Sequence, residues 1–178
     1  MQLSGTLPIQ FTATIENLRK RLDQIIDLVP WVLSHGDLSD MNILADPVSG
    51  HLTGVVDWAE ATIEPFGISL WGLQSVLGCI RDDGWSYHSE DTFRSRMLFQ
   101  KTFLTEIGCT ISSETREALN ELQTLGTLLR YGFAWENGLQ KTTNDITLLE
   151  IHLQGASNWT TNDYRKTHQW HEDCFRVD

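Results

Sequence analysis

Apolar residues near the start of the chain recur at steps of three and four, which is typical of one face of an α-helix. These residues are Phe11, Ile15, Leu18, Leu22, Ile25, Ile26 and Val29. The spacing predicts a helix over about residues 12–28, which Pro30 ends because proline cannot continue a helix. Lys20, Arg21 and Asp23 fall on the opposite, polar face.

Short apolar runs separated by turn-forming residues follow this helix. Trp31-Val32-Leu33 predicts a strand that leads into a polar loop. Two further β-prone runs, at 42–45 and 52–56, flank the turn-forming segment 46–50. Proline and glycine between two such runs are typical of a β-hairpin. We therefore predict a hairpin whose second strand delivers Asp57 to one end.

The remainder of the chain has helical patterns. We predict a buried helix over Ser69–Ile80, a helix from about Phe93 to Gly108, and a last helix from about Asn144 to His152. A long helix is expected from about Ser113, its N-cap, with an apolar stripe formed by Leu119, Leu122, Leu125, Leu129 and Phe133.

These patterns predict an α+β fold that is mainly helical. At 178 residues, 40% of them hydrophobic, the chain suits one domain over residues 1–178, with a loosely ordered tail over 155–178. The seven tryptophans should mostly pack helices together, although one or two could line a pocket for an organic ligand.

The net charge of −11 predicts a surface that repels nucleic acid and anionic membranes, so we expect neither as a partner. Three widely spaced cysteines without a Cys-x-x-Cys pair indicate neither a zinc site nor a disulfide framework. The N-terminus has no basic and apolar signal pattern. We therefore expect a cytoplasmic protein.

One stretch carries candidate chemistry: His35-Gly36-Asp37-Leu38-Ser39-Asp40-Met41-Asn42, followed after the hairpin by Val55-Val56-Asp57-Trp58. Phosphoryl transfer needs a carboxylate that orients the attacking hydroxyl and oxygen ligands for Mg²⁺. Asp37 and Asn42 can converge on one loop, and the hairpin can bring Asp57 beside Asn42. Mg²⁺ accepts such a sparse set of oxygens and completes its octahedron with water and phosphate.

This string resembles the catalytic loop of the aminoglycoside phosphotransferase and choline kinase-like family, in which His-Gly-Asp-Leu-x-x-x-Asn-Ile-Leu precedes a hairpin and Val-Val-Asp-Trp. The segments Pro65–Leu73 and Leu129–Phe133 are similar to a fungal branch of that family. The resemblance covers roughly Ile15 to Gly138. It implies a protein-kinase-like C-terminal lobe in which the catalytic-loop hairpin carries the site.

The resemblance also implies residue roles. Asp37 would orient and deprotonate the acceptor hydroxyl, and Asn42 and Asp57 would bind the metal. His35 is a second catalytic candidate, for which a structural role in the loop is favoured over proton transfer. Asp40 and Glu60 depart from the family pattern and are expected at the surface or as loop caps.

The nucleotide-clamping N-terminal lobe of a kinase has no counterpart in the 34 residues before His35. Gly5 is the only glycine and Lys20 the only lysine in that stretch, and Lys20 lies on a polar helix face. We therefore expect a C-terminal lobe alone, with its nucleotide-binding residues unassigned. Mg²⁺ with ATP or GTP would be the cofactors of a kinase, once an N-terminal lobe is supplied.

Three functions remain open from the sequence. The first is a small-molecule phosphotransferase. The second is a cofactor-independent acid–base enzyme of fungal secondary metabolism, an isomerase or cyclase, that uses Asp37, His35 and Asp57 on the truncated lobe. The third is a non-catalytic, pseudokinase-like binding protein, in which a homo-oligomer or a partner chain covers the exposed lobe surface.

Overall fold

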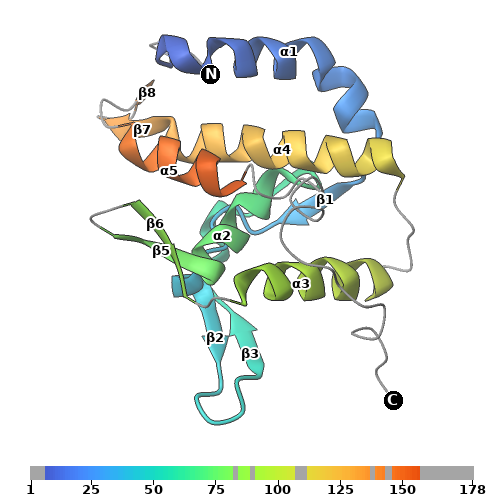
Figure 1. Cartoon of the computed structure of the whole chain (residues 1–178), viewed down its shortest axis with the longest axis vertical. Coiled ribbons are helices and arrows are strands. Elements are labelled where there is room, and N and C mark those ends of the chain that lie inside the picture. Colours follow the sequence, from blue (N-terminus) through green and yellow to red (C-terminus); the bar gives the residue numbers. More distant parts are fainter. Residues whose placement is uncertain are drawn as a thin grey trace.

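The computed structural model describes residues 7–81, 84–88, 91–106, 112–136, 139–142 and 146–156. Within these ranges the fold is a mixture of α-helices and short antiparallel sheets, and helices predominate, as the sequence predicts (Figure 1).

The helices carry most of the packing. They are α1 (Thr12–Asp27), α2 (Gly72–Leu77), α3 (Thr92–Glu106), α4 (Ser113–Tyr131) and α5 (Thr147–Ala156). The described residues also contain the 3₁₀ turns η1 (Ile9–Phe11), η2 (Asp40–Asn42), η3 (Trp58–Glu60) and η4 (Ile68–Trp71).

The strands form two-stranded antiparallel ribbons. β1 (Trp31–Ser34) pairs with β4 (Thr62–Pro65), and β2 (Ile43–Ala45) pairs with β3 (Leu52–Val55). β5 (Gly78–Arg81) pairs with β6 (Gly84–Tyr87), and β7 (Phe133–Glu136) pairs with β8 (Leu139–Thr142). The β2–β3 pair is the predicted hairpin, and it projects away from the helices at the foot of Figure 1.

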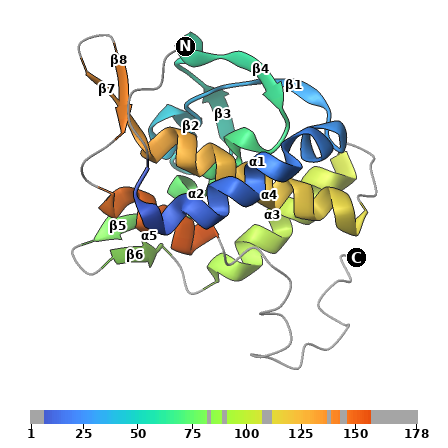
Figure 2. The same ribbon diagram turned by 90° about the horizontal axis from the view of Figure 1, so that it is seen from above.

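The core lies where α1 and α5 pack against α4 (Figures 1 and 2). Its two buried clusters are Phe11, Leu18, Leu128 and Leu149, and Ile25, Val29, Ala118 and Leu122. The α1 members belong to the apolar stripe that the sequence predicts, so this helix is confirmed with its interior face. Arg21, from the polar side, forms ion pairs with Glu117 and Glu121 of α4.

Helix α4 and turn η4 approach each other closely next to the site. A Cβ atom at Gly126 of α4 would lie 1.9 Å from the carbonyl oxygen of Ile68 in η4. A side chain at this position would therefore force the two segments apart. Turn η4 leads directly into α2, which packs against the predicted catalytic loop. The absence of a side chain at Gly126 therefore lets η4 and α2 lie as close to α4 as they do.

Several predicted boundaries are wrong. The helix expected to reach Ile80 ends at Leu77, because Gly78 takes an extended conformation (φ −167°, ψ 178°) and begins β5. Ser112, not Ser113, is the N-cap of α4: its side-chain oxygen accepts a 3.0 Å hydrogen bond from the Thr115 N–H. α4 ends at Tyr131, so Phe133 lies in β7.

Other predictions fall partly outside the described residues. The last helix begins at Thr147, whereas residues 143–145 are not described. The predicted tail over 155–178 is described only to Ala156, and Gly108, the expected end of α3, is not described either. Among the described helices, none combines the length and apolarity that crossing a bilayer would require.

The Gly126 contact yields a stability prediction. Glycine to alanine inside an exposed helix stabilises it by about 1 kcal/mol. Gly126→Ala should instead lower the free energy of unfolding by about 2 kcal/mol, because overpacking costs roughly 1–3 kcal/mol. Urea denaturation followed by circular dichroism measures the change. Gly54→Ala is the control, since the nearest atom to a Cβ there is 3.7 Å away, and a stabilised Gly126→Ala variant would contradict the packing described.

Candidate active site

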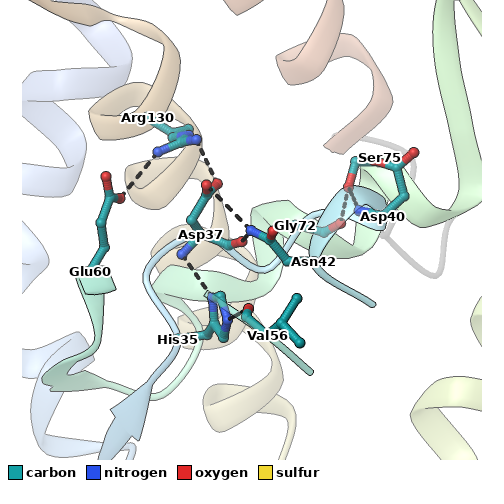
Figure 3. Close-up of polar contacts among 9 residues, drawn as sticks. All are labelled: His35, Asp37, Asp40, Asn42, Val56, Glu60, Gly72, Ser75 and Arg130. Atoms are coloured by element: carbon teal, nitrogen blue, oxygen red, sulfur yellow. Dashed lines mark hydrogen bonds and ion pairs between the residues drawn. The ribbon is translucent and has the colours of Figure 1, made fainter. Parts of the chain in front are cut away.

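The predicted catalytic loop leaves the end of β1 and runs into η2 (Figure 3). His35, only 5% exposed, holds the start of this loop through both ring nitrogens. Its Nδ1 accepts a 3.3 Å hydrogen bond from the Asp37 N–H, and its Nε2 lies 2.7 Å from the carbonyl oxygen of Val56. Because Nδ1 is the acceptor, Nε2 carries the hydrogen and donates it to Val56.

Asn42 closes the loop from its other end. Its side-chain Nδ2 donates to the backbone carbonyl of Asp37 at 2.8 Å and lies 3.5 Å from the Asp37 carboxylate oxygen Oδ2. The carbonyl of Asn42 accepts a 3.0 Å bond from the Val56 N–H. The structure therefore brings Asp37 and Asn42 together and attaches both to the residue that precedes Asp57.

Asp57 has an unusual backbone. Its φ of 61° and ψ of 60° lie in the left-handed region, and among the described non-glycine residues it alone has a positive φ. This conformation costs a residue with a Cβ about 1–2 kcal/mol. Asp57 is exposed, directly after the β3 ribbon and before η3. Strained residues of this kind cluster at functional sites, where the surrounding structure holds them in place.

Helix α2 supports the loop from behind. The Asp40 N–H donates to the Ser75 hydroxyl at 3.3 Å, and that hydroxyl donates to the Gly72 carbonyl at 2.7 Å. A Cβ atom at Gly72 would lie 1.9 Å from the carbonyl oxygen of Leu38, so loop and helix touch through their backbones. Asp40 itself is exposed at the start of η2, which agrees with its expected surface position.

Arg130 of α4 is a site residue that the sequence did not single out for chemistry. Its Nη2 forms a 2.5 Å ion pair with Asp37 Oδ1, and its Nη1 lies 3.4 Å from Glu60 Oε2 (Figure 3). The guanidinium lies over the indole ring of Trp71, 4.9 Å from its centroid. Arg130 is 93 residues from Asp37. No spacing rule connects residues so far apart; the only signal was the Leu129–Phe133 segment quoted for the family resemblance.

Behind Trp71 the site rests on uncharged aromatic groups. Tyr131 meets Trp71 edge-on, with ring centroids 5.8 Å apart, and its ring lies 3.8 Å from that of His152. Burial raises the pKa of Tyr131 to about 12; Arg130 opposes the rise, while the negative charge of Asp37 adds to it. Burial also lowers the pKa of His152. Both rings therefore stay neutral beneath the Arg130 ion pairs near pH 7.

A pocket of about 290 Å³ opens beside these ion pairs. It is lined by Gly36, Glu60, Ile68, Trp71, Gly126, Leu129, Arg130 and Phe133. Leu129 was predicted on the apolar stripe of α4; it is 44% exposed and borders this pocket. The pocket thus adjoins the loop that carries Asp37.

In the parts of the chain that the structure describes, no group of three or more His, Cys, Asp or Glu side chains could hold a metal ion. The two predicted metal ligands, Asn42 and Asp57, would supply one amide oxygen and one carboxylate. This sparse oxygen set is of the kind that Mg²⁺ shares with phosphates and water.

Comparison with known proteins gives one match. The family described as the phosphotransferase enzyme family matches residues 4–96, just over half of the 178 residues. No curated protein and no solved structure matches the chain. The matched segment includes His35, Asp37, Asn42 and Asp57, whereas Arg130 lies beyond it.

The backbone of Asp57 leads to a prediction. Since glycine adopts a positive φ without steric cost, Asp57→Gly should be more stable than Asp57→Ala by about 1 kcal/mol in urea denaturation. The same pair of substitutions at Thr53, within the β3 strand, should show the opposite order. Equal stability of the two Asp57 variants would mean that no strain is stored at this residue.

The raised pKa of Tyr131 predicts that the stability of the fold depends on pH. Its pKa in the folded chain is about 12 and its ordinary value is 10.0, so the folded state binds the phenol proton more tightly than the unfolded state. The free energy of unfolding should therefore fall as the pH rises from about 10 to 12. Denaturation at stepped pH values measures this slope, and Tyr131→Phe should remove that part of it. A slope unchanged in Tyr131→Phe would assign the effect to other groups.

Proposed function

Because the chain belongs to the phosphotransferase enzyme family, we propose that it transfers a phosphoryl group from ATP or GTP to the hydroxyl of a small molecule. The nucleotide contacts of the N-terminal lobe, for which we assign no residues, would come from another chain or segment. We also propose that the protein belongs to the fungal branch suggested by the Pro65–Leu73 and Leu129–Phe133 segments.

The observation that carries this proposal is how the Asp37 carboxylate is held. Arg130 fixes Oδ1, whereas Oδ2 lies 3.5 Å from the Asn42 amide, too long for a strong hydrogen bond. Oδ2 is therefore the atom that can accept a hydrogen bond from an acceptor hydroxyl. In this role Asp37 orients the hydroxyl oxygen toward the phosphoryl group and takes up its proton.

Asn42 and Asp57 would hold Mg²⁺ with the phosphates of the nucleotide. Bound there, Mg²⁺ would neutralise the charge that develops on the phosphoryl oxygens. One backbone hydrogen bond supports this pairing of Asn42 with Asp57. The Val56 N–H donates to the Asn42 carbonyl, which brings the backbone next to Asp57 close to Asn42. The left-handed backbone of Asp57 adds support, because strained residues of this kind cluster at functional sites.

In this proposal His35 has a structural role. Both of its ring nitrogens are engaged with backbone groups, one on the catalytic loop and one on the segment before Asp57. Moving a proton through the ring would break one of these bonds. The ring therefore positions the two aspartates and takes no part in proton transfer.

The test is phosphoryl transfer from [γ-³²P]ATP or GTP, with Mg²⁺, to the small metabolites of a cell extract. Asp37→Asn, Asn42→Ala and Asp57→Asn should each lower labelling by at least about a hundredfold, a typical loss for acid–base or metal-binding groups. Asp23→Asn, on the polar face of α1, is the matched control and should retain labelling. Calorimetric titration with Mg·ATP, with and without candidate N-lobe partners, measures binding separately.

Two outcomes would overturn the proposal in favour of an alternative. Turnover of a metabolite without nucleotide or metal, abolished by Asp37→Asn, would identify a cofactor-independent acid–base enzyme. The pocket beside the Asp37 loop favours this alternative over a binding protein, because it offers a small molecule access to that loop. Absence of nucleotide binding and turnover under every partner condition would instead indicate a pseudokinase-like binding role.

A further inference from the structure

We propose that Glu60 is a positioning residue: with Arg130, it holds turn η3, and therefore Asp57, against the loop that carries Asp37. Glu60 departs from the family pattern, and Arg130 lies beyond the matched segment 4–96, so the family match implies neither role. This inference rests on the proposed function, because it assigns the residues that keep the two aspartates of the same site in register.

The backbone of Glu60 touches the catalytic loop at Gly36. A Cβ atom at Gly36 would lie 2.3 Å from the carbonyl oxygen of Glu60 and 2.9 Å from its carbonyl carbon. Gly36 also has a φ of 80°, which glycine adopts without steric cost. The end of η3 therefore packs directly against the residue before Asp37, and glycine leaves the room for this contact.

The side chain of Glu60 reaches the same loop through Arg130. The guanidinium presents its N–H groups in a rigid fork. Its Nη1 lies 3.4 Å from Glu60 Oε2, and its Nη2 lies 2.5 Å from Asp37 Oδ1, so one cation joins a carboxylate of η3 to a carboxylate of the loop (Figure 3). Both pairs are partly exposed to solvent and add little to the overall stability. Their effect is on local geometry.

A buried ring fixes the place of the shared cation. The Arg130 guanidinium lies over the indole of Trp71, 4.9 Å from the ring centroid, and Trp71 is only 4% exposed. Tryptophan is the best aromatic partner for a cation in this arrangement. Tyr131 meets the same indole edge-on. The core therefore sets the position of the guanidinium, and the two carboxylates are held relative to that point.

The other end of η3 has its own anchor. The indole N–H of Trp58 donates to the Val55 carbonyl at 2.9 Å, and its ring centroid lies 4.7 Å from that of His35. Trp58 begins η3 and Glu60 ends it. The two Glu60 contacts, its carbonyl against Gly36 and its ion pair with Arg130, therefore hold the end that Trp58 does not.

Asp57 lies between two anchored segments. Val56 before it is tied to the catalytic loop by the hydrogen bonds described above, and η3 follows directly after it. Its left-handed backbone, with a φ of 61°, persists only where the surrounding structure over-determines it. The Glu60 contacts are the part of that structure that links η3 to the loop carrying Asp37. Loss of these contacts should let Asp57 move relative to Asp37.

Amide hydrogen exchange, measured by NMR without nucleotide or metal, tests the ion pair. The Ala61 N–H closes η3 through a 3.1 Å hydrogen bond, so its exchange reports local opening of this turn. Arg130→Gln and Glu60→Gln should each quicken this exchange by about fivefold, equivalent to about 1 kcal/mol, the upper end for exposed ion pairs. The Gly50 N–H, bonded to the Asp46 carbonyl in the hairpin turn, is the internal reference and should not change.

Gly36→Ala tests the backbone contact. Its Cβ would overlap the Glu60 carbonyl, so exchange of the Ala61 amide should quicken by at least fivefold, about the effect of losing the ion pair. Gly50→Ala is the matched control, because Gly50 also has a positive φ, 71°, yet nothing lies within 4 Å of a Cβ there. Both variants carry the cost of a strained backbone, and only Gly36→Ala should alter η3.

In the phosphoryl-transfer assay, the Glu60 contacts should affect kcat rather than nucleotide binding. Glu60→Gln should lower kcat by about tenfold, because small misplacements of reacting groups are costly. The KM for Mg·ATP should stay within about twofold, since Asn42 and Asp57 are still present. A merely structural role would lower the amount of folded protein and leave kcat per folded molecule unchanged.

Thermal unfolding of each variant confirms that it is folded. The proposal is overturned if exchange of Ala61 is unchanged in folded Arg130→Gln and Glu60→Gln, or if Gly36→Ala and Gly50→Ala affect it equally. An unchanged kcat in Glu60→Gln would overturn it as well. Absence of phosphoryl transfer by the wild-type chain would reject the proposed function, whereas the exchange results would still decide whether the Glu60 contacts hold η3.

Discussion

The candidate site depends on the hydrogen bonds of one backbone unit, that of Val56. Its N–H bonds the carbonyl of Asn42, and its carbonyl accepts from the ring of His35, which in turn accepts from the Asp37 N–H. Residues on either side of the β2–β3 hairpin are thereby joined through a buried imidazole. The hairpin alone is a short two-stranded ribbon, which is marginally stable by itself. These bonds therefore fix the position of the backbone that leads into Asp57.

Helix α4 supplies the other half of the site. Its interior face belongs to the core with α1 and α5, while Arg130, near its C-terminal end, reaches Asp37 and Glu60. The close contact of Gly126 with η4 sets the distance between α4 and the segment that carries Trp71. Packing of the core therefore determines the position of a charged group at the site.

The sequence predicted the elements that depend on local patterns. The stripe of α1 was predicted because Leu18 and Ile25 follow helical spacing, and the hairpin because turn residues separate two β-prone runs. The string from His35 to Asp57 predicted a family that the profile match supports. Its individual roles for Asp37, His35, Asn42 and Asp57 remain predictions, although hydrogen bonds join the first three to Val56, the residue before Asp57.

What the sequence could not predict depends on contacts between distant segments. The pairing of β5 with β6 ended a helix that apolar composition alone would have continued through Gly78. Arg130 became a site residue only because α4 packs beside the loop 93 residues earlier. Leu129 follows the periodicity of the apolar stripe, yet it is exposed and borders a pocket.

The central claim is that Asp37, Asn42 and Asp57 surround one metal–nucleotide position. Paramagnetic broadening by Mn²⁺·ADP, read from the assigned NMR signals of these residues, tests it most directly. The account predicts that all three signals broaden at the same low Mn²⁺ concentration, while that of Asp46, at the far end of the hairpin, does not. Broadening at Asp46 or Asp40 that leaves Asp57 unaffected would contradict it.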